Sequence, residues 1–283
     1  MLATGLAPIP HELRTEDGKH IYTIEGHDHE LESVTTNLRV INKENINTWR
    51  EKLGRAEAMR IKTEGGDIGR MVHSAGLRLF KGEGYGTYEW SQLGHPTPED
   101  ERVRNCVCAL QLLRQERTLN LLGAEVFVWS QEYAYAGTLD AAVLVENELV
   151  AAVGSPAGLA ELLREHPEAV AVDLYDWKTS GAVYPEAWLQ LGAYAVAFME
   201  SYHIPVRRIY PVRLDRGLPT VPHDEQGGPI RSPVYELGQM VPGPDGTKVR
   251  QEFMEGDDLM DAFEAYMHAQ ELGSWTRRYG GRY

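Results

Sequence analysis

Residues 33–122 carry the spacing of apolar side chains that is typical of helices. Apolar residues three and four positions apart lie on one face of a helix. One such stripe consists of Ile68, Met71, Val72, Ala75 and Leu79. The adjacent Gly65 and Gly66 weaken a helix, so we expect a break there. The pattern predicts a first helix that is capped by Asn45 or Asn47 and carries Trp49, Leu53, Ala56 and Met59. A second helix is expected over residues 67–81, a loop over 82–98 and a third helix over 100–122.

Beyond residue 122 the pattern changes to one of strands. Residues 124–129 alternate and are rich in β-formers. Residues 169–177 begin with an apolar run, as in a strand that is covered on both faces. The other expected strands cover residues 137–145, with 148–152 as hairpin partner, 208–214 and 234–237, and the expected helices cover 156–165, 185–201 and 257–272.

These elements predict the domain organisation. Residues 1–32 show little periodicity, so we expect an irregular N-terminal arm, with a short hairpin around residues 20–25 as the alternative. No strong linker divides residues 33–283, which we expect to form a single domain. Its parts are a helical part (33–122), a sheet core (123–215) and a C-terminal extension (216–283). The order of elements favours the α/β class, with a central mixed β-sheet flanked by helices.

Composition adds little to this fold but limits the partners. The chain has 42% hydrophobic and 25% charged residues, as ordinary globular proteins do. No apolar run approaches the ~20 residues of a membrane-spanning helix, so we expect no membrane partner. Residues 1–10 lack the basic start of a signal peptide. Cys106 and Cys108 lie two residues apart in an expected helix and cannot pair locally, which favours a reducing cytoplasm.

Charge is unevenly distributed along the chain. The formal net charge of −14 argues against a protein that coats nucleic acid non-specifically. Residues 39–81, however, hold ten Lys or Arg and five Asp or Glu, a local net charge of +5. This stretch favours one basic groove on an acidic protein, and a scatter of solvated charges is the alternative.

Candidate chemistry lies on two neighbouring expected strands. Asp176 and Lys178 are two residues apart on a strand and therefore share a face. Asp140 stands among apolar residues, where a carboxylate without a partner is costly. A divalent cation shared with Asp176 would supply that partner, because Mg²⁺ prefers carboxylates, water and phosphate oxygens. A structural salt bridge is the alternative for Asp140. His73 lies on an expected helix, and its alternative is an ordinary role on the surface or in the core.

In order along the chain, these residues resemble a known series of motifs. Gln190 and Tyr194, four residues apart on one helix face, complete the series Gly-x-x-x-His, Gly-x-x-Asp, Asp-x-Lys and Gln-x-x-x-Tyr. This series resembles the RecB-like branch of the PD-(D/E)XK nucleases. The segments that carry the resemblance are Tyr135-Ala-Gly-Thr-Leu-Asp140 and Tyr175-Asp-Trp-Lys-Thr-Ser180. Ser33-Val-Thr, Trp49 and Gly69-Arg-Met-Val-His73 resemble the start of phage exonucleases and of the mitochondrial genome-maintenance exonuclease, so that residues 33–215 are covered.

The resemblance implies a restriction-endonuclease-like core and a Mg²⁺- or Mn²⁺-dependent deoxyribonuclease with one or two ions. Two cysteines cannot ligate a four-cysteine cluster, so no iron–sulfur cluster is expected. Lys178 is expected to orient or deprotonate the attacking water, and Gln190 and Tyr194 to support the site. The implied metal ligands are His73, Asp140, Asp176 and the backbone carbonyl of Trp177, with Glu125 as a further acid that binds the metal directly or lies beside it.

The implied function is a DNA exonuclease that acts on ends or single strands in phage or bacterial recombination, replication or repair. It would work in the cytoplasm of a bacterium or of a phage-infected host. The candidate DNA contacts are Ser33, Thr35, Thr36, Trp49 and Arg70, because hydroxyls and guanidinium groups bind phosphate and indole rings stack on bases. Capping of the next helix is the alternative for Ser33 and Thr36. A structure-specific or nicking endonuclease, a non-catalytic nucleic-acid-binding module and a metal-dependent phosphatase remain open, as does the role of an insert at 154–167.

Overall fold

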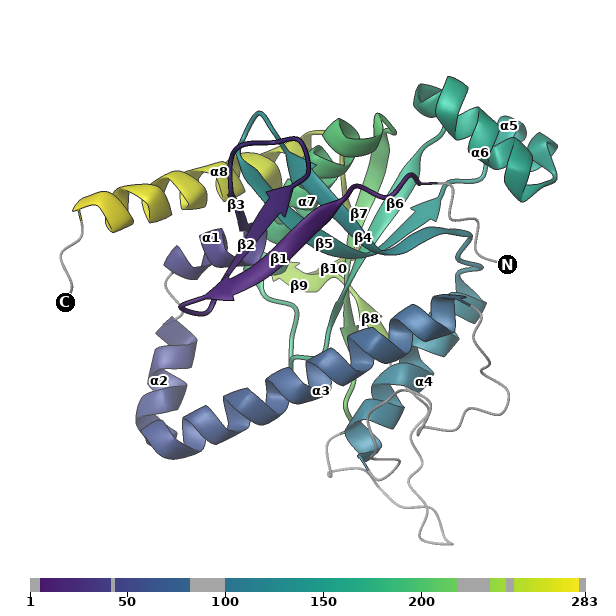
Figure 1. The fold of residues 1–283 in the computed structure, drawn as a ribbon. Coiled ribbons are helices and arrows are strands. Elements are labelled where there is room, and N and C mark those ends of the chain that lie inside the picture. Colours follow the sequence, from purple (N-terminus) through teal and green to yellow (C-terminus); the bar gives the residue numbers. More distant parts are fainter. Residues whose placement is uncertain (1–5, 42–43, 82–99, 218–234, 243–246, 280–283) are drawn as a thin grey trace, which may run out of the picture.

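A nine-stranded mixed β-sheet forms the centre of the protein. The computed structural model describes residues 6–41, 44–81, 100–217, 235–242 and 247–279, and the expected loop over 82–98 lies outside them. Helices α3 (Arg55–Lys81) and α4 (Glu101–Glu116) pack on one face of the sheet, and α7 (Pro185–Tyr202) and α8 (Gly256–Tyr279) on the other (Figure 1). The predicted α/β class with a central mixed sheet and flanking helices is therefore confirmed.

The strands of the main sheet come from the whole length of the chain. They are β1 (His11–Glu16), β2 (Lys19–Ile24), β3 (Leu31–Ser33), β4 (Leu121–Ser130), β5 (Tyr135–Leu144), β6 (Val172–Lys178), β7 (Val206–Leu214), β8 (Tyr235–Leu237) and β11 (Met254–Glu255). A separate two-stranded sheet contains β9 (Gln239–Pro242) and β10 (Lys248–Gln251). The shorter helices are α1 (Val34–Asn37), η1 (Leu38–Val40), α2 (Glu44–Leu53), α5 (Glu148–Val153), α6 (Pro156–Glu165) and η3 (Pro167–Ala169).

Strand β5 changes its partner halfway along one edge. Its other edge pairs with β4 from Tyr135 to Val143. On the first edge, β3 pairs in parallel with Tyr135 and Ala136, and β6 pairs antiparallel only with residues 141–144. Residues 137–140 therefore have no strand partner on that edge within the described part of the chain. The sheet forks at this point, and strand β6 continues in parallel with β7 beyond its last pair with β5.

Two apolar clusters hold the helices against the sheet. The first joins Leu139 and Leu174 to Leu191 of α7 and Phe263 of α8. The second joins the underside of β5, β6 and β7 to α3 and α4, with Val72, Trp177 and Leu110 among its members. No helix within the described ranges combines the length and the apolar character needed to cross a membrane.

The N-terminal arm contradicts the prediction of an irregular segment over residues 1–32. Residues 11–24 form the β1–β2 hairpin, which is longer than the hairpin considered as the alternative, and β3 joins it to β5. The solvent exposure of β1 explains why its sequence did not look like that of a strand. Every residue of β1 is exposed, so this edge strand shows no apolar alternation.

The expected break at Gly65 and Gly66 is wrong, because α3 runs through both glycines. Glycine costs a helix about 1 kcal/mol per residue, which the packing of α3 on the sheet offsets. A Cβ atom at Gly65 would lie 3.6 Å from the guanidinium nitrogens of Arg216, and one at Gly69 would lie 3.6 Å from Oγ1 of Thr179. This part of α3 therefore lies beside the end of β6.

Three other boundaries also differ from the prediction. Residues 148–152 are not a hairpin partner of the preceding strand but lie in α5, because the side chain of Asn147 caps the helix and Gly154 ends it in the left-handed conformation. The helix expected over 100–122 ends at Glu116, and β4 begins at Leu121. Helix α2 begins at Glu44, so neither Asn45 nor Asn47 precedes it as a cap.

Gly192→Ala tests the contact between α7 and α8. A Cβ atom there would lie 2.8 Å from the backbone nitrogen of Phe263 and 3.0 Å from the carbonyl carbon of Ala262. Backbone cannot rotate out of the way as a side chain can, so we expect a loss of about 1–3 kcal/mol in the free energy of unfolding, measured with urea. Gly181→Ala is the control, because nothing lies within 4 Å of its Cβ position. Equal stability of both variants would refute the close packing of the two helices.

Candidate functional site

A kink in the β4–β5 hairpin creates the centre of the site. Along a regular strand, residues two apart face the same side of the sheet. Here Ala124 and Ala141 pack on the α3 face, whereas Val126 and Leu139 pack on the α7 face. Both strands thus change sides between these pairs, at Glu125 and Asp140. Glu125 has a φ of +50°, a left-handed conformation that is strained for a residue with a side chain and that often marks functional sites.

The kink turns Asp140 into the fork of the sheet. Its Oδ2 accepts the backbone N–H of Trp177 on β6 at 2.6 Å, and its Oδ1 lies 2.6 Å from Nδ1 of His73. The side chain is only 5% exposed. Burial raises the pKa of Asp140, while the nearby imidazole opposes that rise. The Asp140 carboxylate in turn raises the pKa of His73, so a proton is held between the two groups where a cation could take its place.

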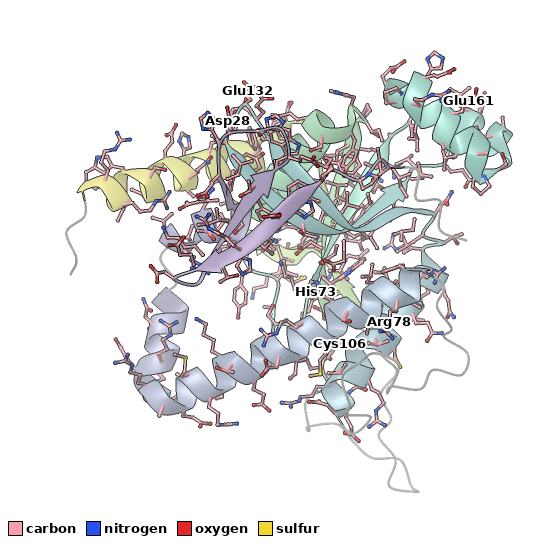
Figure 2. The ribbon with its side chains drawn as sticks, viewed as in Figure 1. Asp28, His73, Arg78, Cys106, Glu132 and Glu161 are labelled. Atoms are coloured by element: carbon pink, nitrogen blue, oxygen red, sulfur yellow. The ribbon has the colours of Figure 1, made fainter. Side chains whose placement is uncertain are left out.

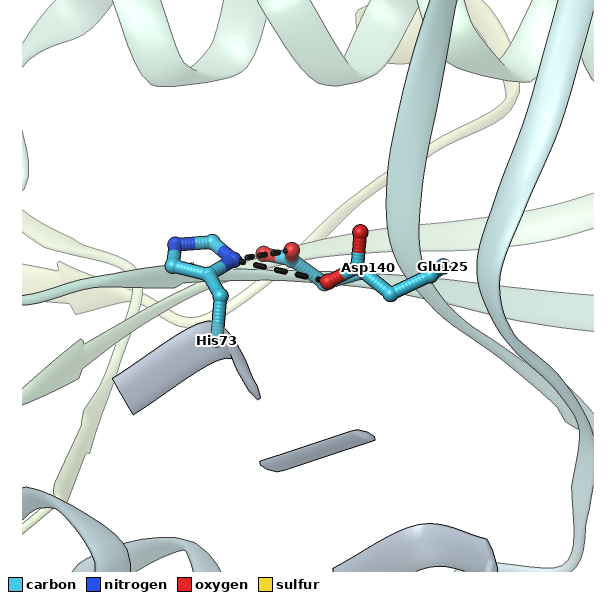
Figure 3. Close-up of side chains that lie close together, drawn as sticks. All are labelled: His73, Glu125 and Asp140. Atoms are coloured by element: carbon cyan, nitrogen blue, oxygen red, sulfur yellow. Dashed lines mark hydrogen bonds and ion pairs between the residues drawn. The ribbon is translucent and has the colours of Figure 1, made fainter. Parts of the chain in front are cut away.

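His73 reaches the fork from α3, and Glu125 joins it from β4. Figure 2 shows His73 on α3 beneath the sheet, and Figure 3 shows its ring facing Asp140 and Glu125. Oε1 of Glu125 lies 3.8 Å from Nδ1 of His73. One ligand atom from each of the three residues lies within 4.8 Å of the others, which makes them a group that could hold a metal ion. The structure thus brings together three of the predicted ligands.

Asp176 lies in a second polar group on the α7 side. Its Oδ2 lies 2.5 Å from Nζ of Lys178, and its Oδ1 accepts a hydrogen bond from Nε2 of Gln190 at 3.3 Å. Lys178 donates to Oε1 of Gln190 at 2.8 Å. Nε2 of Gln190 also donates to the hydroxyl of Tyr194 at 3.0 Å. The four residues predicted from two motifs therefore form one connected network.

Tyr194 fits against β5 because residue 137 is glycine. A Cβ atom at Gly137 would lie 2.5 Å from Cε1 of the Tyr194 ring. Burial raises the pKa of Tyr194, so its hydroxyl stays neutral. The ring lies over Gly137 on the α7 face of β5, and its hydroxyl holds Gln190 in place beside Lys178.

The donor atoms fit a hard divalent cation. Oδ2 of Asp176 is buried and accepts no hydrogen bond with acceptable geometry, despite its ion pair with Lys178. Its charge is balanced by the Lys178 ammonium, and its lone pairs, which accept no hydrogen bond, are available to a metal ion. The N–H and C=O groups of one strand residue point to the same neighbour, so the carbonyl of Trp177 also faces β5. Carboxylate, carbonyl and imidazole ligands of this kind suit Mg²⁺ or Mn²⁺. Asp176 does not belong to the group formed by His73, Glu125 and Asp140, and lies beside it.

A cleft of about 1100 Å³ opens next to this network. Lys178 and Gln190 line it from β6 and α7. Cationic side chains line the opposite wall, which α1, η1, α2 and α3 build. Those residues are Arg39, Arg50 and Lys62, together with Thr35.

The predicted DNA contacts fall into different environments. Ser33 caps α1 by accepting the N–H of Thr36 at 3.1 Å, and both side chains are buried. The capping role that was the alternative is therefore present. Thr35 is exposed and lines the cleft. Arg70 is exposed and forms an ion pair with Asp67. The side chain of Trp49 lies outside the described residues.

Several cleft residues carry no motif. Arg39, Arg50 and Lys62 belong to the basic stretch over 39–81, so charge was their signal in the sequence. Ser180 and Tyr184 also line the cleft, between the end of β6 and the start of α7. Ser180 ends the motif segment that begins at Tyr175, whereas nothing in the local sequence marks Tyr184, because only the fold sets it opposite the basic wall.

No family model matches the chain, and no curated protein matches it in sequence.

Metal binding can be tested with two buried aspartates. Asp140→Asn keeps an acceptor for the N–H of Trp177 but removes the charge. We expect Mn²⁺ affinity to fall at least ~10–100-fold by calorimetry, the loss that follows even from removing a residue that only supports a metal ligand.

Asp173→Asn is the matched control for this substitution. Asp173 is also 5% exposed, but its carboxylate pairs with Arg207 at 2.9 and 2.5 Å. This variant should lose stability and keep its Mn²⁺ affinity. Unchanged Mn²⁺ binding in Asp140→Asn would rule out Asp140 as a ligand.

Proposed function

We propose that this protein is a Mg²⁺- or Mn²⁺-dependent nuclease that hydrolyses DNA phosphodiester bonds. The observation that carries the proposal is the meeting of His73, Glu125 and Asp140 beside the Asp176–Lys178 pair. The group lies next to a cleft with a basic wall. Acid ligands, a lysine and a surface with several cations are the parts that this hydrolysis requires.

The residues at the fork would hold the metal. His73, Asp140 and Glu125 would bind it, with Asp176 and the carbonyl of Trp177 on the β6 side. When bound, one or two divalent ions would help to deprotonate water and would offset charge on the phosphate. Oδ2 of Asp176 supports this assignment, because it is buried, accepts no hydrogen bond and lies near the carboxylate of Asp140.

Lys178 would act on the water and on the phosphate. Its ammonium group lies between Asp176 and Gln190 and is about a quarter exposed, so it can reach into the cleft. It would donate a hydrogen bond to a phosphate oxygen as charge builds there. Gln190 holds this ammonium in place, and Tyr194 holds Gln190. Gln190 and Tyr194 are thus positioning residues.

The cleft reconciles nucleic-acid binding with an acidic protein. The net charge is −14, yet Arg39, Arg50 and Lys62 face the cleft together. Phosphate contacts depend on local cations, and metal ligands must themselves be acidic. The residue order that resembles the RecB-like PD-(D/E)XK nucleases supports the same chemistry, and we propose that the sheet around the fork is a core of that type.

We further propose action at DNA ends, in phage or bacterial recombination, replication or repair. The cleft has α1, η1, α2 and α3 along one wall and β6 and α7 along the other. Figure 1 shows α2 and the beginning of α3 meeting at a bend, and the later part of α3 packs against the sheet. A DNA strand can enter between two such walls more easily at a free end than in the middle of a rigid duplex.

Lys178→Ala tests the catalytic assignment. With Mg²⁺ or Mn²⁺ present, we expect the wild-type protein to cleave a labelled oligonucleotide and EDTA to stop it. In the variant, kcat should fall about 10²- to 10⁴-fold with little change in KM, because the lysine acts mainly in the transition state. Lys62→Ala is the control from the opposite wall, and it should raise KM and keep kcat. Cleavage that persists in EDTA would overturn the proposal.

Closed circular DNA tests the requirement for an end. We expect linear single strands to be digested and closed circular single strands of the same length to resist, since a circle offers no end to the cleft. Duplex with blunt ends should be cut more slowly than the linear single strand. Rapid loss of the circle would favour a structure-specific or nicking endonuclease instead.

A further inference from the structure

Tyr184 lines the basic cleft, as two residues of the proposed active site do. It precedes the first residue of α7, on the segment that joins β6 to that helix. Lys178 and Gln190, on either side of it in the chain, line the same cleft. A nucleotide whose phosphate lies beside Lys178 would therefore have its base near Tyr184.

Its side chain is unusually exposed for a large ring at a site. Tyr184 is 48% exposed, while nearly all other tyrosines and tryptophans of the central sheet and α7 are buried or half-buried. Among the described residues that line the cleft it is the only aromatic one, and no described aromatic ring stacks on it. A ring face that no described aromatic ring covers, in a cleft with both cationic and apolar side chains, is suited to a flat partner.

The opposite wall is suited to phosphates. No described carboxylate lies within ion-pair distance of Arg39, Arg50 or Lys62, and Arg39 is held by the carbonyl of Gly18. The cleft thus has cations on one wall and a ring on the other. Proteins bind unpaired nucleic acid with this combination, because cations follow the backbone and aromatic rings stack on the bases.

We propose that Tyr184 stacks on an unpaired nucleobase next to the phosphate that is cleaved, and that it selects single-stranded over duplex DNA. The inference rests on the proposed function. In a duplex the faces of each base are covered by its neighbours, so the ring of Tyr184 gains nothing from it. An unpaired base can rotate away from its neighbours and stack on the ring. It then loses conformational entropy but breaks no base pair.

Binding rather than cleavage tests this inference. Fluorescence anisotropy would measure the affinity of a labelled single-stranded oligonucleotide and of its duplex, with Ca²⁺ present to prevent turnover. We expect Tyr184→Ala to weaken single-strand binding about 5- to 150-fold, which is the ~1–3 kcal/mol of base–aromatic stacking at about 1.4 kcal/mol per factor of ten. Tyr184→Phe should bind like the wild type, because the ring and not the hydroxyl stacks. Duplex binding should not change in either variant.

An abasic scan separates stacking from a structural role. A single abasic position is moved along the oligonucleotide, and we expect one position at which it weakens wild-type binding but not the binding of Tyr184→Ala. A variant with a collapsed cleft would instead lose duplex and single-strand affinity together. Leu149→Ala is the control for an exposed apolar side chain on α5, outside the cleft.

Two failures can be told apart. If the wild type binds and cuts DNA but the abasic scan is flat, or is the same in Tyr184→Ala, the stacking role is wrong and the nuclease proposal stands. Loss of duplex and single-strand affinity together in Tyr184→Ala would likewise overturn the stacking role. If the wild type neither binds nor cuts DNA, both proposals fail.

Discussion

The Asp140 carboxylate joins three elements that are far apart in the chain. One oxygen accepts the N–H of Trp177 on β6 and the other contacts His73 on α3, while the residue itself belongs to β5. A buried carboxylate is stable only if its charge is balanced and its lone pairs are used. Three features supply partners to this one carboxylate: the fork of the sheet, the approach of α3 and the kink at Glu125. The fold around the site therefore depends on balancing its charge and filling its hydrogen bonds.

The same constraint explains the unusual backbone nearby. A regular β4–β5 ladder would point Asp140 at one face of the sheet, out of reach of the N–H of Trp177. The positive φ of Glu125 is a local cost that is offset by the hydrogen bonds it permits. On the other side, α3 passes beside the end of β6, with Gly69 next to Thr179, and this position brings His73 to the fork. The strained backbone at Glu125 and the position of α3 thus both bring groups to one charge.

Chemistry and recognition occupy adjoining parts of the molecule. The metal-ligand candidates lie in the fork, where burial strengthens electrostatic interactions. The cleft beside it is open and carries the cations. Solvent screens these cations, so that a phosphate bound to them can also be released. Lys178 belongs to both, since it pairs with Asp176 and also lines the cleft. A single lysine can therefore link substrate position to the proposed reaction.

The sequence by itself determined the fold class, most strands and helices, and the order of the candidate site residues. The elements follow from local periodicity. His73, Asp140, Asp176 and Lys178 were each weak signals by themselves, and their order along the chain singled them out through its resemblance to known motifs. Tertiary structure alone decided the β1–β2 hairpin, the unbroken α3 and the meeting of His73 with Asp140, 67 residues apart. It also decided the cleft and the place of Tyr184 in it. The reason is physical. These features depend on long-range contacts, which no local pattern encodes: an exposed edge strand, a helix that passes through glycines, and a cleft lined from six elements.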